Sequence, residues 1–133
     1  MRFLVVMTAL VGAAAILTGA FGAHALKSNL LAWGTLATWQ TAVHYHLMHA
    51  SALLAACLYA SGNAPAAARR WLLRACACWG LGIALFSGSL YWLAVGGPHW
   101  LGPVTPFGGL LLIAGWLCVI GAAPTRPAAD TSA

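Results

Sequence analysis

The sequence predicts an all-α membrane protein, a bundle of four transmembrane helices with a short interfacial helix after the first. Two observations on composition support this class: 62% of the 133 residues are hydrophobic and only 5% are charged, and the mean hydropathy is +0.88. A soluble domain would carry about 25% charged residues. The third observation is that the apolar residues form four long runs, and about 20 apolar residues suffice to cross a bilayer.

The first predicted span covers residues 3–23, which contain no charged side chain. This segment also resembles a signal peptide, because Arg2 precedes an apolar core and Ala23-His24-Ala25 resembles an A-x-A cleavage site. We expect the segment to be retained. Its apolar run is longer than a typical signal-peptide core, and its recurring glycines are typical of a helix that packs on others.

Residues 24–38 are predicted to form a short connection on the outer side of the membrane. Leu26, Leu30 and Trp33 recur at helical spacing, while polar side chains occupy the other faces. An amphipathic segment of this kind favours the membrane interface. We therefore expect one or two turns of interfacial helix here.

Glycine and proline divide the rest of the chain, because these residues break helices. The remaining predicted spans are residues 39–60, 75–95 and 107–123. Residues 1–123 then form a single transmembrane domain, followed by a disordered cytoplasmic tail over residues 124–133.

The basic residues predict the orientation of the four spans. One side of the membrane would hold Arg2, Arg69, Arg70, Arg74 and Arg126, and the other side would hold Lys27. Cytoplasmic loops carry the excess of Lys and Arg. We therefore expect a multi-pass protein of a bacterial-type inner membrane with both termini in the cytoplasm.

The lack of acidic residues excludes several function classes. The only acid, Asp130, lies in the predicted tail, so no carboxylate is available inside the membrane. Carboxylate proton relays, paired-carboxylate hydrolysis and a Ser-His-acid triad all require one. The basic residues are not clustered as nucleic-acid binding requires. The sequence therefore predicts a protein that is not an enzyme and does not bind nucleic acid.

Polar rings gather in residues 41–50, TAVHYHLMHA, within the second predicted span. On a helix, His46 and His49 lie three residues apart and Tyr45 and His49 four apart, so the three share one flank. Counted from Trp39, His49 would lie about 15 Å into the membrane, near its midplane. Ionisable side chains at that depth are uncommon and call for an explanation.

Two interpretations of these residues remain open. In the first, Tyr45 and His49 face the bundle interior and form a polar cluster with Ser87 and Tyr91, which lie four residues apart on the third span. Such groups hydrogen-bond between helices. In the second, the histidines bind a ligand: His46 and His49, with His24 as a distant third, are candidate ligands for copper, zinc or haem iron. A proton relay, or a contact with a quinone or a lipid head group, belongs to this second interpretation as well.

Four segments in this order resemble a known family. They are Gly19–Leu26 (GAFGAHAL), Thr41–Ala50, Leu85–Tyr91 (LFSGSLY), and Thr105–Gly109 (TPFGG) followed by Ala114–Trp116 (AGW). Together they resemble the domain-of-unknown-function 423 family, small membrane proteins such as the YgdD-like inner-membrane proteins of bacteria, over about residues 10–123. The resemblance implies four membrane helices with a retained first helix and brings no known activity. At His46 this chain departs from the pattern, where a glutamine or similar residue is expected, whereas His24 and His49 match it.

The sequence thus predicts a small non-enzymatic accessory or interaction subunit. Its partners would be the lipid bilayer and either further copies of itself or a larger membrane complex. The alternative function is a membrane binder or carrier of a metal, haem or quinone through the His/Tyr cluster.

Overall fold

The computed structural model describes residues 2–62 and 64–123. These residues form five α-helices and one 3-10 helix, with no strand among them. In chain order they are α1 (Arg2–Ala23), α2 (Lys27–Ala32), α3 (Leu36–Ser61), α4 (Ala66–Ala94), η1 (His99–Leu101) and α5 (Val104–Gly121). The prediction of an all-α protein is confirmed for this part of the chain. The predicted tail, residues 124–133, lies outside the described residues.

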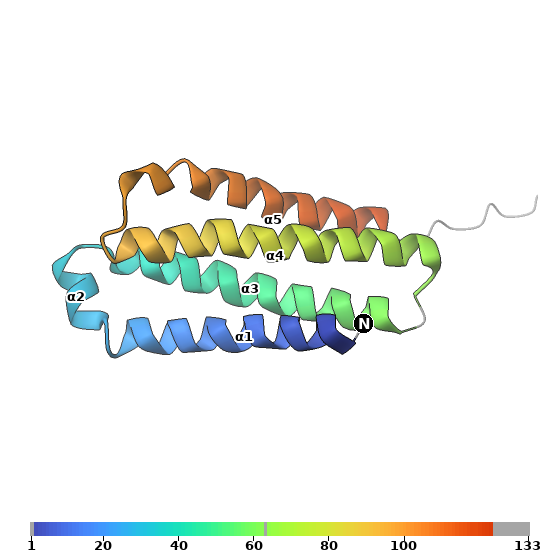
Figure 1. The fold of residues 1–133 in the computed structure, drawn as a ribbon, viewed down its shortest axis with the longest axis horizontal. Coiled ribbons are helices and arrows are strands. Elements are labelled where there is room, and N and C mark those ends of the chain that lie inside the picture. Colours follow the sequence, from blue (N-terminus) through green and yellow to red (C-terminus); the bar gives the residue numbers. More distant parts are fainter. Residues whose placement is uncertain (1, 63, 124–133) are drawn as a thin grey trace, which may run out of the picture.

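The four long helices lie side by side in the order α1, α3, α4, α5 (Figure 1). Each packs mainly on its neighbour in this order, so α3 and α4 form the middle of the molecule and α1 and α5 its two outer helices. The start of α1, the end of α3, the start of α4 and the end of α5 lie at one end (Figure 1). The short helices α2 and η1 lie at the other end.

Within the described residues, three helical segments are long and apolar enough to cross a membrane: Arg2–Ala23, Ala66–Ala94 and His99–Gly121. The remaining long helix, α3, has 26 residues, which gives it a length of about 39 Å. It is not among the three because Gln40 and three histidines lower its hydropathy. The crossing of the membrane by residues 39–60 therefore stays a prediction.

Two glycines end helices at the same end of the molecule. Gly34 after α2 and Gly96 after α4 have φ angles of 69° and 89°. This left-handed region is costly for residues with a Cβ atom, and a glycine there commonly terminates a helix. Short α2 is present where the sequence predicted one or two helical turns, and its position in a membrane interface stays a prediction.

The helix α4 begins nine residues before the predicted third span. Arg69, Arg70 and Arg74, expected in a loop, lie on its first turns. The physical reason is that nothing breaks the helix after Pro65: alanine and arginine are strong helix formers, and proline is tolerated at a helix start. Charge patterning predicts which residues avoid the membrane but does not predict where the helix starts.

The main core lies between α3, α4 and α5 and is centred on Trp79, which is 1% exposed. The residues packed around it are mostly small or aliphatic: Leu53, Ala56, Ala60, Leu72, Ala75, Ile83 and Leu112. A second cluster of Leu30, Trp39 and Ala94 joins α2, α3 and α4 near the other end. Large apolar side chains on α1 and α5, among them Phe3, Leu17, Phe107 and Ile120, are exposed. Such outward-facing apolar surface suits helices surrounded by lipid.

The helices α4 and α5 approach closely at Gly108. A Cβ atom at this position would lie 2.7 Å from the Cα atom of Phe86 and 2.8 Å from the carbonyl carbon of Leu85. Both are backbone atoms, so only glycine permits this contact. Small residues have this role at helix interfaces in membranes.

Candidate functional site

The histidine-rich stretch of α3 lies against α4 in the middle of the molecule. His46 and His49 are buried, with 7% and 3% of their surfaces exposed, whereas Tyr45 is 38% exposed. His44 is also exposed. The helical spacing of three residues separates His46 from His49 by about 60° around α3. The two buried rings therefore meet different neighbours.

His49 has a hydrogen-bond partner at each ring nitrogen. The indole Nε1 of Trp116 on α5 lies 3.2 Å from Nε2 of His49. Because an indole nitrogen only donates, Nε2 is the acceptor and the proton of the neutral ring lies on Nδ1. Nδ1 then donates to the carbonyl oxygen of Tyr45 at 2.9 Å. The ring has no nitrogen left for a ligand.

Aromatic rings enclose His49 further. Tyr45 stacks on it, with a centroid distance of 5.9 Å and an interplanar angle of 11°. Trp79 and Trp116 lie edge-on to it, at centroid distances of 6.5 Å and 6.2 Å. Trp79 also donates from Nε1 to the carbonyl oxygen of Leu112 at 3.2 Å. His49 is thus part of an aromatic cluster that joins α3, α4 and α5.

His46 belongs to a separate hydrogen-bonded row that joins α3, α4 and α1. The Thr18 hydroxyl donates to the carbonyl oxygen of Ala15 at 3.0 Å. Its single proton is then used, so the Tyr91 hydroxyl, 2.9 Å away, donates to Thr18. The Tyr91 oxygen in turn accepts from Nδ1 of His46 at 3.3 Å. This row satisfies Tyr91 and one nitrogen of His46.

Three residues of the predicted polar cluster, Tyr45, His49 and Tyr91, are thus divided between two networks, and Ser87 belongs to neither. Tyr45 stacks on His49, while Tyr91 bonds to His46. Ser87 is fully buried, and its hydroxyl is the one buried side-chain polar atom in the described residues without a hydrogen-bond partner. Ser87 therefore does not bond to either histidine.

The candidate metal ligands do not meet. His24 is exposed in the turn between α1 and α2. Across residues 2–62 and 64–123, no group of three His, Cys, Asp or Glu side chains is placed to hold a metal ion. His46 and His49, moreover, bond to different helices, His46 to Tyr91 on α4 and His49 to Trp116 on α5.

Sequence reasoning missed four residues that complete these networks: Thr18, Trp39, Trp79 and Trp116. Trp39 donates from Nε1 to the carbonyl oxygen of Thr18 at 3.0 Å and lies against the Tyr91 ring. The available signal was the tryptophan content of the apolar runs, because a buried indole N–H needs an acceptor.

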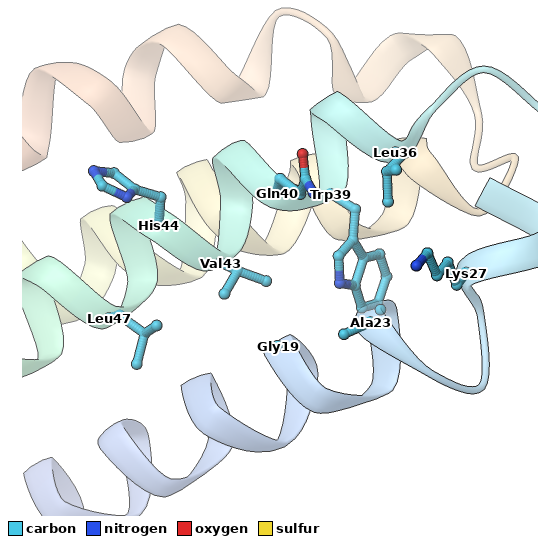
Figure 2. A pocket seen from close by; sticks show the side chains of 10 residues that line it. Gly19, Ala23, Lys27, Leu36, Trp39, Gln40, Val43, His44 and Leu47 are labelled. Atoms are coloured by element: carbon cyan, nitrogen blue, oxygen red, sulfur yellow. The ribbon is translucent and has the colours of Figure 1, made fainter. Parts of the chain in front are cut away.

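A groove of about 370 Å³ lies between α1 and α3 at the end where α2 is found. Figure 2 shows Trp39, Val43 and Leu47 pointing from α3 toward α1, and Lys27 reaching back toward the Trp39 ring. Gln40 and His44 add polar groups to the same lining. Small residues of α1, among them Gly19, make the groove possible.

A second hollow of about 370 Å³ continues this groove along the same two helices. The two hollows share Leu47. The second one is lined mainly by small or aliphatic residues, among them Gly12, Ala13 and Ala50. Together they form what we call the α1/α3 groove.

Comparison with known proteins places the chain in a family. The model of a family described as "Protein of unknown function (DUF423)" matches residues 18–109. No solved structure matches the chain.

The relatives are bacterial proteins of similar length. The UPF0382 membrane protein YwdK of Bacillus subtilis is 36% identical over 126 residues, which cover 92% of this chain and 97% of YwdK. The UPF0382 membrane protein SH2409 of Staphylococcus haemolyticus is 38% identical, covering 90% of this chain and 93% of its own length. The UPF0382 inner membrane protein YgdD of Escherichia coli K12 is 37% identical, covering 91% and 89%.

Proposed function

This chain belongs to the DUF423 family, as its motifs predicted, and from that premise we propose that it is a non-enzymatic accessory protein of the bacterial inner membrane. It acts through contacts of its helices with lipid and with other membrane proteins. One relative, YgdD, is named an inner membrane protein. The observation that carries the proposal is that the buried histidines hydrogen-bond to other groups of the protein itself.

His49 is the decisive residue for this proposal. Both of its ring nitrogens are engaged, by Trp116 and by the Tyr45 carbonyl. A metal or haem iron at either nitrogen would have to break one of these bonds, and the same holds for a proton relay through the ring. Buried histidines of this kind hold helices together, as interhelical hydrogen bonds do in membranes.

Surfaces for partners remain on the outer faces. A Cβ atom added to Gly88, on α4, would meet no atom within 4 Å. Glycines on an open helix face allow another helix to approach closely. This position supports contact with a second copy or with a larger complex.

The proposed topology has four spans with both ends in the cytoplasm. Both α1 and α4 start at the same end of the molecule (Figure 1). If both cross the membrane, α3 must cross back between them. Arg2, Arg69, Arg70 and Arg74 lie toward that end, and the positive-inside rule favours the cytoplasm for it.

A reporter fused after Ala133 tests this topology. We expect a green fluorescent protein there to fluoresce and an alkaline phosphatase there to be inactive, because four crossings return the chain to its starting side. A phosphatase fused after Trp33, in the opposite connection, is the control and should be active. Active phosphatase at Ala133 would mean an odd number of crossings and would contradict the inclusion of α3.

The metal content of the detergent-purified protein tests the function. We expect no stoichiometric copper, zinc or haem iron and no visible absorption band, because His49 has no free nitrogen. The His46→Ala/His49→Ala variant should give the same result. Stoichiometric metal or haem in the wild type that disappears in the variant would overturn the accessory function.

One observation favours the second candidate, a binder or carrier of a metal, haem or quinone. The Ser87 hydroxyl is buried without a partner in the described residues, and such a group calls for an explanation. A small ligand or a buried water that accepts this hydrogen bond would provide one. A quinone that co-purifies with the wild type and not with Ser87→Ala would support this alternative.

A further inference from the structure

The α1/α3 groove is long enough to hold the acyl chain of a lipid. Its lining on α3 extends from Leu36 to Leu54, which corresponds to about 27 Å along the helix axis. One leaflet of hydrocarbon is about 15 Å deep, half the thickness of the bilayer core. The groove is therefore longer than one leaflet is deep, and an acyl chain that enters at the α2 end can stay in it through the whole leaflet.

The two ends of the groove differ in chemistry. The α2 end carries the ammonium group of Lys27, which lies beside the Trp39 ring and can hydrogen-bond an anion (Figure 2). Gln40 and His44 also line this part of the groove, but their side chains are directed away from α1. Farther along, Gly12, Ala13 and other small or aliphatic residues line the groove. This combination of a polar mouth and an apolar channel matches an amphiphile with a charged head and a hydrocarbon tail.

The charge at the mouth is unbalanced. No acidic side chain occurs in residues 2–62 and 64–123, because the single acid of the chain is Asp130. The Lys27 ammonium thus has no carboxylate partner within the described part of the protein. An ammonium binds phosphate oxygens strongly as a point charge.

We propose that the α1/α3 groove binds one anionic phospholipid. The phosphate lies at Lys27, and one acyl chain follows α1 and α3 past Leu47. A second cavity, between α1, α3 and α4, is lined by apolar residues and by Thr8 and cysteines. It lacks a charged group and does not fit the same ligand. This inference goes beyond the accessory function and is independent of the metal content.

Native mass spectrometry of the full chain in detergent tests the proposal. With dioleoyl phosphatidylglycerol and dioleoyl phosphatidylcholine at equal concentration, we expect one molecule of the anionic lipid to be retained in preference. Lys27→Gln should reduce this preference about fivefold, the value of one lysine near an anionic headgroup. Arg74→Gln, at the other end of the molecule, should leave it unchanged.

A matched pair of glycine substitutions tests the channel. Gly12→Leu places a side chain in the groove without a backbone clash and should weaken retention of the lipid, whereas Gly80→Leu extends into the other cavity and should not. Circular dichroism checks that both variants remain helical. If Gly12→Leu does not fold, Ala13→Leu replaces it.

Three outcomes would overturn the proposal. They are an unchanged lipid preference in Lys27→Gln, loss of lipid in Gly80→Leu but not in the groove variant, and displacement of the lipid by millimolar inorganic phosphate. The last would show that the site binds a free anion and does not need the acyl chain.

Discussion

Replacing Gly108 with alanine is expected to lower the free energy of unfolding by about 1–3 kcal/mol, the usual cost of overpacking a well-packed core. The added Cβ atom would lie 2.7 Å from the Cα atom of Phe86. Because this neighbour is backbone, no change of side-chain rotamer removes the clash, and α4 and α5 must move apart. That movement weakens the hydrogen bonds from Trp79 to Leu112 and between Ser89 and Thr105. Unfolding in dodecyl sulfate, followed by far-UV circular dichroism, measures the change.

Gly88→Ala is the matched control on α4. Its Cβ atom would meet nothing within 4 Å, and alanine favours a helix over glycine by about 1 kcal/mol. We expect this variant to be as stable as the wild type or more stable. If Gly108→Ala and Gly88→Ala lowered stability equally, the result would contradict the close approach of α5 to the backbone of α4 at Gly108.

The positions of the helices along the chain could be predicted because they depend on local sequence. Apolar runs and the glycines and prolines between them fixed the four long segments, and the spacing of Leu26, Leu30 and Trp33 predicted α2. The start of α4 was missed because arginine is unfavourable in lipid but favourable in a helix. Hydropathy measures only how well a residue is tolerated in lipid. It therefore predicts too late a start for a helix that extends beyond its apolar run.

The interior of the site was harder to predict because it depends on which helices are neighbours. Placing His46 and His49 on one flank of α3 was a fair description of a single helix. In the structure, however, His46 bonds to Tyr91 on α4 and His49 to Trp116 on α5, so the two rings belong to separate networks. No local pattern pairs residue 49 with residue 116.

Glycine positions had a general prediction and a specific outcome. The sequence indicated that glycines let helices approach closely. It did not indicate that Gly115 leaves the space which the Trp79 indole fills. That pairing sets the position of α5 on α4 and brings Trp116 within hydrogen-bond distance of His49. Trp116 can thus reach His49 because residue 115 is a glycine and leaves room for the Trp79 indole.

His49→Ala is expected to lower the free energy of unfolding by about 2 kcal/mol, at the low end for large-to-small core substitutions. The ring packs against Tyr45, Trp79 and Trp116, and its loss leaves a cavity and an indole N–H without its acceptor. The value lies at the low end because helices in lipid gain little from the hydrophobic effect. The same unfolding measurement applies. His44→Ala, at an exposed position of the same helix, should change stability by less than about 0.5 kcal/mol.

A double-mutant cycle with Trp116→Phe isolates the hydrogen bond, because phenylalanine keeps an aromatic ring but lacks the indole N–H. We expect the two substitutions to be coupled by about 0.6 kcal/mol, the average for interhelical hydrogen bonds in membranes. Coupling of this size would mean that Trp116 occupies Nε2 of His49 in the folded protein. An additive result would mean that Trp116 does not bond to Nε2 of His49, and the histidine would again be a candidate ligand. The cycle thus tests, through stability alone, the premise on which the accessory function depends.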